Sequence, residues 1–314
     1  MKHELPTAAR PLKIGTRGSP LALAQAHETR RRLSAAFGLP DEAFEIVVIS
    51  TAGDRIQDKP LKELGGKGLF TREIESDLLQ GFIDIAVHSM KDMPVLQPEG
   101  LELDCYLPRE DVRDAYVSLS GGTMTDLPDG ATVGTSSLRR KSQLLHRRPD
   151  LRIVEFRGNV QTRLKKLKEN FADGTFLAMA GLNRLGMNHV PRVAIEPDEM
   201  LPAVAQGAIG IERRADDMAV AALLEALHHT ETGQRLGAER AFLAALDGSC
   251  QTPIAGLAEL DGGTVRLRGE ILRIDGSEAL ADDQTAPIED GPEMAIAMAE
   301  RLLTRAGEGF FDWR

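Results

Sequence analysis

The sequence has 314 residues, 42% of them hydrophobic and 27% charged, which is ordinary for a globular protein and long enough for two or three domains. A formal net charge of −10 at pH 7 argues against a general nucleic-acid-binding protein. The sequence has no apolar run of membrane-spanning length, and residues 1–11 lack the apolar core of a secretory signal, so we expect neither membrane insertion nor secretion.

The first part of the chain has the pattern of an α/β domain. The expected strands are 12–17 and 44–49, and the expected helices are 20–38 and 69–80. Ser19 and Pro20 are suited to the N-cap and first position of the first helix, and Gly38 to its end. The glycine-rich stretch 51–68 is long for a loop in a compact domain, and we expect it to be a lid.

The stretch 83–94 is the centre of this first part. It begins as a short apolar run typical of a buried parallel strand and then becomes polar, with His88, Ser89, Lys91 and Asp92. Ligands of open α/β sheets bind beyond the carboxyl ends of the strands, so this polar end is a candidate site. A Lys-Asp pair on its own would more often be a solvated turn. The arginines described below favour the site.

A similar pattern recurs in the second part of the chain. Residues 14–21 and 133–140 both run from an apolar strand through Gly-Thr to a hydroxyl-bearing cap residue and a helix. We therefore expect two similarly built α/β lobes. Each would direct the N-terminal N–H groups of a helix at a cleft, where they would attract an anion.

The remaining segments predict the rest of a second lobe and a smaller α+β unit. The polar run 109–114 is interpreted as a crossing segment, and the small-residue run 203–212 as a return to the first lobe. Expected strands are 152–156, 176–180, one beginning at 254, and 264–268. Expected helices are one after Asn159 with an apolar face of Val160, Leu164, Leu167 and Phe171, two within 218–245 that separate near 230–233, and 292–305.

Six arginines follow predicted strands or lie in the first turns of the next helix. They are Arg17, Arg139, Arg140, Arg157, Arg163 and Arg184. The guanidinium group is always charged and binds carboxylates through two parallel hydrogen bonds. The alternative is that these side chains lie on solvated helix faces, but their positions at strand ends favour a site for a polyanion.

The chain has only two cysteines, which excludes a disulfide framework and indicates a reducing, cytoplasmic environment. Cys105 lies in an apolar run and is expected to be buried. Cys250 lies in the turn-rich segment 247–253, where a thiol is more often reactive. We expect no metal site, because the adjacent His228 and His229 have no further ligands at a suitable spacing.

Over nearly its whole length the sequence resembles the porphobilinogen deaminase family, also called hydroxymethylbilane synthases. The motifs that carry the resemblance are GTRGSPLAL (15–23), GGKGLF (65–70), AVHSMKDMP (86–94), VGTSSLRR (133–140), RGNV (157–160), AGLNRLG (180–186) and GSCQTP (248–253). Several ordered motifs are far more specific than any one of them. Ala205 and Ser249 stand where the family often has glycine, and neither departure removes a functional side chain.

The resemblance implies an α/β fold with two periplasmic-binding-protein-like lobes around a cleft and a smaller α+β C-terminal domain. The implied domains are 1–107 with 207–225, 112–200, and 230–314. It also implies a dipyrromethane cofactor attached to Cys250 through a thioether. This primer would be extended by four porphobilinogen units, with loss of ammonia at each, before hydrolysis releases a linear tetrapyrrole.

The resemblance also assigns roles to single residues. Asp92 matches the family's catalytic carboxylate. The matching cofactor-binding residues are Cys250, Lys91, Ser137, Arg139 and Arg140, and the matching substrate-binding residues are Arg17, Ser19, Lys67, Arg157, Arg163 and Arg184. The residue types agree with this chemistry, because each pyrrole ring carries two carboxylates and loss of ammonia leaves a cation that an aspartate stabilises.

A non-enzymatic solute-binding module is the main alternative, because the same two-lobed architecture binds anions without chemistry. The lack of a signal segment weakens this alternative, and a covalent adduct on Cys250 would exclude it. A phosphoryl-handling enzyme would be expected to have a Gly-rich P-loop, which the sequence lacks. We therefore expect a cytoplasmic, monomeric enzyme that binds porphobilinogen and neither nucleic acid nor membrane.

Overall fold

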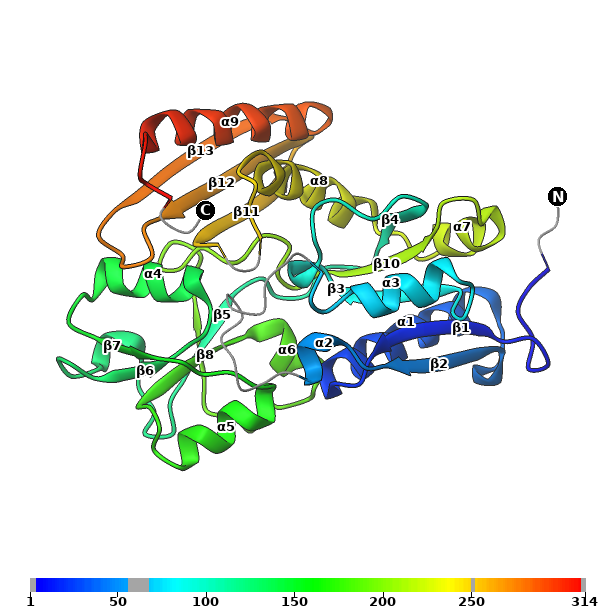
Figure 1. Ribbon diagram of the computed structural model, residues 1–314, viewed down its shortest axis with the longest axis horizontal. Coiled ribbons are helices and arrows are strands. Elements are labelled where there is room, and N and C mark those ends of the chain that lie inside the picture. Colours follow the sequence, from blue (N-terminus) through cyan, green and yellow to red (C-terminus); the bar gives the residue numbers. More distant parts are fainter. Residues whose placement is uncertain (1–3, 56–67, 250–251, 312–314) are drawn as a thin grey trace. The chain divides into compact units, whose positions relative to one another are not determined.

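The computed structural model describes residues 4–55, 68–249 and 252–311. The chain divides into two compact units, of which unit 1 comprises residues 1–110 and 208–233 and unit 2 comprises residues 111–207 and 234–314 (Figure 1). None of the described helices is both long and apolar enough to cross a membrane.

Unit 1 is built on a five-stranded sheet of order β2-β1-β3-β10-β4. Its strands are β1 (Leu12–Arg17), β2 (Phe44–Ile49), β3 (Ile85–Ser89), β4 (Leu101–Tyr106) and β10 (Ile209–Arg214), and its helices are α1 (Pro20–Phe37), α2 (Ala52–Arg55), α3 (Arg72–Leu79) and α7 (Met218–Glu225). Strands β1, β2 and β3 are parallel, whereas β10 is antiparallel to both of its neighbours. The side chains of α1 and α7 pack on one face of the sheet and those of α3 on the other.

Local sequence signals explain most of unit 1. The Ser19 side chain accepts the N–H of Ala22 at the start of α1, and Gly38 ends that helix in the left-handed conformation, as predicted. The helix expected at 69–80 begins only at Arg72. The reason is a preceding turn in which Gly68 has φ +86° and its carbonyl accepts the N–H of Thr71.

Unit 2 contains a second five-stranded sheet, of order β7-β6-β8-β5-β9. Its strands are β5 (Asp114–Val117), β6 (Thr132–Gly134), β7 (Arg152–Val154), β8 (Gly174–Ala178) and β9 (Val193–Ile195), and its helices are α4 (Leu138–Arg147), α5 (Val160–Lys168) and α6 (Met179–Arg184). Again three strands are parallel and the fourth, β5, is antiparallel to its neighbours. The expected structural repeat is therefore confirmed by topology.

The fourth strand stands at a different place in the chain order of each unit, and the sequence pattern indicated this difference only in part. The fourth strand of unit 1, β10, follows unit 2's sheet in the chain, as expected for the returning segment. The fourth strand of unit 2, β5, precedes the other strands of its sheet. The interpretation of 109–114 as a crossing segment missed β5, because the strand has only four residues and follows a charged run. All four of its residues are buried.

Two further features of unit 2 differ from the sequence interpretation: one strand was missed and one residue was assigned to the wrong element. Strand β9 was not predicted, because three residues give too short an apolar pattern. Phe171 does not belong to the apolar face of α5. The helix ends at Lys168, Asn170 adopts φ +57°, and Phe171 is 61% exposed.

The C-terminal part of unit 2 is a three-stranded antiparallel sheet with α9 packed on β12 and β13 (Figure 1). Its elements are β11 (Ile254–Asp261), β12 (Thr264–Leu272), β13 (Ala279–Pro287), α8 (Thr230–Ala245) and α9 (Gly291–Ala306). Strand β13 was missed because it is polar, and the break between the helices lies at 226–229, slightly before the predicted one. The α/β class with a smaller α+β C-terminal part is confirmed.

Candidate active site

In unit 1, the predicted site residues follow two neighbouring parallel strands. Arg17 ends β1 and Ser19 follows it, while Lys91 and Asp92 follow β3. Because β1 and β3 are parallel, these residues meet at the same edge of the sheet. The structure thus brings together four predicted residues from two motifs.

The turn that carries Lys91 and Asp92 is fixed by its flanking residues. It is a single 3-10 turn, Met90–Asp92, in which Met90 and Met93 are buried while Lys91 and Asp92 are half-buried. The N–H of Met90 donates to the carbonyl of Ala208 at 3.0 Å. Two buried anchors therefore leave the two charged side chains between them little freedom of position.

Behind this turn lies a buried polar group that the sequence interpretation missed in part. His88 Nε2 lies 3.1 Å from Glu212 Oε2, and both side chains are buried. Burial raises the pKa of the nearby Glu75, and Glu212 raises it further, whereas Thr71 and the charges of His88 and Arg72 oppose the shift. Glu212 could have been found as the one acidic residue in the apolar run 208–212.

The other two residues of this edge have structural partners. The Arg17 guanidinium lies 4.2 Å from the ring centroid of Phe70, a cation–π arrangement. The Ser19 hydroxyl oxygen accepts the N–H of Ala22 at 3.2 Å. Ser19 therefore has a capping role that holds whatever else it binds.

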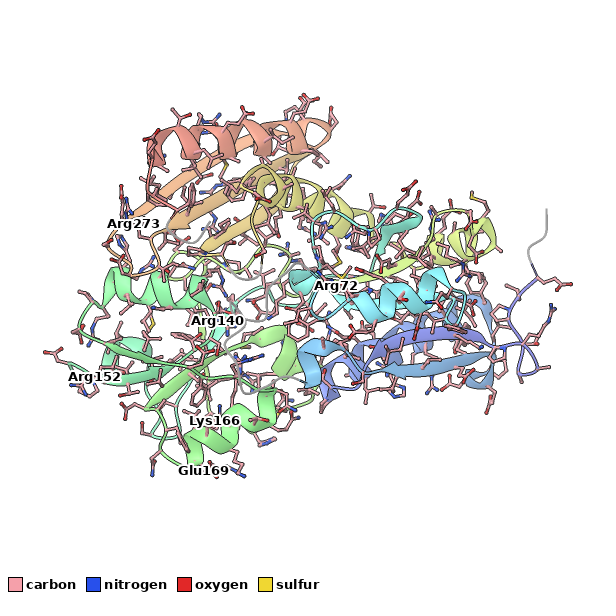
Figure 2. The ribbon with its side chains drawn as sticks, in the orientation of Figure 1. Arg72, Arg140, Arg152, Lys166, Glu169 and Arg273 are labelled. Carbon is pink, nitrogen blue, oxygen red and sulfur yellow. The ribbon has the colours of Figure 1, made fainter. Side chains whose placement is uncertain are left out.

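In unit 2, the predicted residues gather at one edge of the second sheet. Strands β6, β7 and β8 are parallel, so their carboxyl ends share that edge. The residues that follow them are Ser137, Arg139 and Arg140 after β6, Arg157 and Arg163 after β7, and Arg184 after β8. Figure 2 shows the contrast with Arg152 and Glu169, which extend from the outer rim of unit 2, whereas Arg140 lies within it.

Arg139 and Arg140 are not solvated: they are only 4% and 5% exposed, and both face Asp114, which is fully buried. The Nη2 of Arg139 lies 2.8 Å from Asp114 Oδ2, and the Nη2 of Arg140 donates to Asp114 Oδ1 at 2.7 Å. Burial acts to raise the pKa of Asp114, but the two guanidinium charges outweigh it and hold that pKa well below its ordinary range. The sequence interpretation missed Asp114 because it missed β5.

Two of the three remaining arginines of this edge donate to backbone carbonyls. The Nε of Arg163 donates to the carbonyl of Gly158 at 3.0 Å, and the Nη2 of Arg184 donates to that of Gly207 at 3.0 Å. Arg157 lies next to Phe156, whose N–H donates to the Ser136 hydroxyl oxygen at 3.0 Å. All three arginines are half-buried.

Two predicted site residues, Lys67 and Cys250, lie outside the described residues, as does most of the expected lid 51–68. Next to Cys250, the N–H of Thr252 donates to the carbonyl of Ser249 at 3.1 Å. Within the described ranges, no group of three or more His, Cys, Asp or Glu side chains could hold a metal ion.

Comparison with known families finds two matching models that together span most of the chain. Residues 12–222 match the model described as "Porphobilinogen deaminase, dipyromethane cofactor binding domain". Residues 234–304 match the one described as "Porphobilinogen deaminase, C-terminal domain". Among curated proteins, the porphobilinogen deaminase of Paracoccus denitrificans (strain Pd 1222) is 66% identical over 310 residues, with 99% of both chains covered.

Two solved structures show a more distant similarity. A periplasmic substrate-binding protein of an ABC transporter from Coxiella burnetii is 14% identical, with a TM-score of 0.42, 70% of this chain and 93% of that chain covered. The periplasmic VFT2 domain of BvgS from Bordetella pertussis is also 14% identical, with a TM-score of 0.40, 69% of this chain and 86% of that chain covered.

Proposed function

Because this chain belongs to the porphobilinogen deaminase family, we propose that Asp92 is its catalytic carboxylate and that Cys250 carries its dipyrromethane cofactor. The chain catalyses the hydroxymethylbilane synthase reaction, a transferase reaction of tetrapyrrole biosynthesis. Porphobilinogen units are joined one after another to the primer, each losing ammonia, and hydrolysis releases the linear product. The single observation that carries this function is the 66% identity over 99% of the chain.

The residues of unit 2 fit a cofactor that bears carboxylates. Within the described part of the chain, the buried Nε atoms of Arg139 and Arg140 have no hydrogen-bond partner. Two guanidinium groups share the one carboxylate of Asp114, so a positive charge remains for a ligand. We propose that Ser137, Arg139, Arg140 and Lys91 hold the cofactor, which when bound supplies the free pyrrole carbon that each new unit joins.

We propose that Asp92 acts on each incoming porphobilinogen. The departing amine needs a proton, and the remaining substrate carbon becomes electron-poor as the C–N bond breaks. A fixed carboxylate can pass a proton to the amine and stabilise the positive charge that develops. The buried anchors Met90 and Met93 support this role, since electrostatic stabilisation depends on a group that is already in position.

The substrate-binding role falls to the other cations. We propose that Arg17, Lys67, Arg157, Arg163 and Arg184 bind the acetate and propionate groups of the pyrrole rings, together with Ser19. The guanidinium groups of Arg163 and Arg184 each donate to a backbone carbonyl, so less conformational freedom is lost when a carboxylate binds. Lys67 lies outside the described residues, and its assignment rests on the GGKGLF motif at 65–70.

We also propose three domains, 1–107 with 207–225, 112–200, and 230–314. The support for a separate third domain is its own antiparallel sheet, β11 to β13, with α9 against it. We further infer a monomer that acts in the cytoplasm. The free thiol of the buried Cys105 supports a reducing compartment. Light scattering on the purified protein tests the monomer.

Intact mass spectrometry tests the function directly. We expect the wild type to carry the added mass of a dipyrromethane, retained in thiol reductant because a thioether is not cleaved by exchange. Cys250→Ala should lack the adduct. Cys105→Ala is the matched control and should keep it, because burial raises the pKa of the Cys105 thiol to about 12 and keeps it unreactive. Active wild type of unmodified mass would contradict the proposal, as would an adduct on Cys250→Ala.

A further inference from the structure

We propose that Asp114 is a positioning residue: its buried carboxylate is the counter-ion that holds Arg139 and Arg140 in place for a single carboxylate of the pyrrole chain. This inference rests on the proposed function and names a part of the same site that the motifs do not include. Asp114 opens β5 and belongs to none of the motifs that carry the family resemblance.

The geometry gives Asp114 contacts with both arginines at once. Its Oδ1 accepts from the Arg140 Nη2 at 2.7 Å, and its Oδ2 lies 2.8 Å from the Arg139 Nη2. A third group, the Gln206 Nε2, donates to Oδ1 at 2.9 Å and to the carbonyl of Val112 at 2.8 Å. The carboxylate is therefore fixed from two sides.

Each arginine is held at its far side by a backbone carbonyl. The Arg139 Nη1 donates to Leu201 and the Arg140 Nη1 to Phe176, both at 2.9 Å. The two guanidinium groups are neighbours in the sequence and repel each other. Without a carboxylate between them, two buried positive charges would be uncompensated, which is strongly unfavourable.

The balance of positive and negative charges around Arg139 and Arg140 determines what these two arginines can bind. Glu270 also faces Arg139, but burial raises its pKa, and it is shared with Arg147 and His146. Even with Glu270 ionised, three arginines face two carboxylates, so one positive charge is left. One ligand carboxylate completes the balance, and a second one would meet Asp114 as a like charge. Asp114 therefore limits Arg139 and Arg140 to one ligand carboxylate. It also holds both guanidinium groups in position before that carboxylate binds.

The first test compares cofactor loading in full-length variants by intact mass, with folding followed by circular dichroism. Asp114→Asn keeps the size and removes the charge. We expect a folded protein with at least about tenfold less adduct, since losing one partner of a buried charge pair costs that much or more. Asp114→Glu should recover part of the loading. Asp111→Asn is the matched control: its carboxylate binds Arg113 on the same segment, and loading should match the wild type.

The second test uses chemical rescue, which a merely structural role would not produce. In Asp114→Ala, sodium formate present during loading should restore the adduct, and sodium chloride at equal ionic strength should not. If Asp114→Asn does not fold, Asp114→Asn combined with Arg139→Gln returns the cluster to its original net charge. Recovered folding would then support the counter-ion role, and no recovery would contradict it.

Besides a double variant that does not recover folding, two outcomes overturn the inference without touching the proposed function. One is a folded Asp114→Asn that loads as fully as the wild type, and the other is equal rescue by formate and chloride. A wild type without any adduct would instead contradict the proposed function itself. The three outcomes are read from the same spectra and cannot be confused.

Discussion

The two units share one sheet topology, and in each the antiparallel fourth strand contributes a fully buried carboxylate. In unit 1 this is Glu212 of β10, and in unit 2 it is Asp114 of β5. Their partners differ. Glu212 faces His88, which can lose its proton, whereas Asp114 faces Arg139 and Arg140, which cannot.

The pKa values of two buried acids in the two units shift in opposite directions. In unit 2 the two permanent charges hold the pKa of Asp114 well below its ordinary range in spite of burial. In unit 1 burial prevails and raises the pKa of Glu75. Burial therefore raises the pKa of the acid in unit 1, whereas the two arginines of unit 2 outweigh burial at Asp114. This contrast agrees with the proposal that unit 2 holds the anionic cofactor and that Asp92 of unit 1 transfers a proton.

The largest expected effect is the loss of the proposed catalytic charge in unit 1. Asp92→Asn keeps the shape of the side chain but cannot pass a proton or stabilise a cation, so we expect ammonia release to fall by roughly a hundredfold or more. Asp92→Glu should keep a trace of activity, because the carboxylate survives in a shifted place. Ammonia release under saturating porphobilinogen is the measurement.

The control for this variant lies at the other end of the same strand. Asp84 precedes β3, and its carboxylate accepts the N–H of Lys13 at 2.8 Å. Asp84→Asn removes a charge of the same kind and should affect folding stability rather than turnover. Near-normal ammonia release by Asp92→Asn would break the assignment of proton transfer to unit 1.

The next largest effect distinguishes the arginines of the two units, because those of unit 2 are expected to affect cofactor loading and Arg17 of unit 1 is expected to affect elongation. Arg139→Leu or Arg140→Leu should lower cofactor loading by about tenfold or more, because each leaves Asp114 with an incomplete buried partner set. Arg17→Leu should load normally and stall during elongation, which intact mass would show as retained intermediates. The exposed Arg152 of β7 is the control, and Arg152→Leu should behave as the wild type. Normal loading and turnover by all the variants would contradict the anion-binding role.

Much of this comparison could be predicted from local sequence. The strand ends, the caps at Ser19 and Ser137, and the arginines that follow the strands all come from short-range patterns that survive in the fold. Glu212 stands out locally only as the one acidic residue in the apolar run 208–212, and Asp114 does not stand out at all. Both carboxylates are buried by contacts with residues far along the chain, and no local pattern reports a partner about 25 or more residues away in sequence.

The pH dependence of stability offers a finer test of the same contrast. A carboxyl group with a lowered pKa stabilises the fold above its ordinary pKa of about 4, and this stability is lost as the pH falls toward the lowered value. The advantage of the wild type over Asp114→Asn should therefore shrink below pH 4. A carboxyl group with a raised pKa stabilises the fold below its ordinary pKa, and this stability is lost as the pH rises.

For Glu75 the wild type should lose stability as the pH rises from about 4.5 through the raised pKa. Glu75→Gln should thus gain relative to the wild type between pH 4.5 and pH 7. Urea midpoints measured across this range give both curves. If the differences in urea midpoint from the wild type changed with pH in the same direction for the Asp114 and Glu75 variants, the pKa values of the two carboxyl groups would not be shifted in opposite directions.

The smallest expected effect lies at the crossing from unit 2 to unit 1. Ala205 is buried and has φ +61°, a left-handed conformation that costs a residue with a Cβ about 1 kcal/mol or more. Its N–H donates to Glu239 Oε2 at 2.6 Å, while Oε1 of the same buried carboxylate accepts the N–H of Ala258 at 2.8 Å. These contacts hold the strained turn that is followed by Gln206, the partner of Asp114.

Replacing Ala205 with glycine removes the strain but also a buried methyl group and some rigidity of the unfolded chain. Relief of the backbone strain outweighs these two losses, so we expect Ala205→Gly to raise the free energy of unfolding by about 0.5 kcal/mol. Ala208→Gly is the matched control, because Ala208 is equally buried, lies three residues further on and has no left-handed backbone. It should lose about 1 kcal/mol. A loss of stability in both variants would mean that the buried methyl group at 205 matters more than the backbone conformation that it imposes.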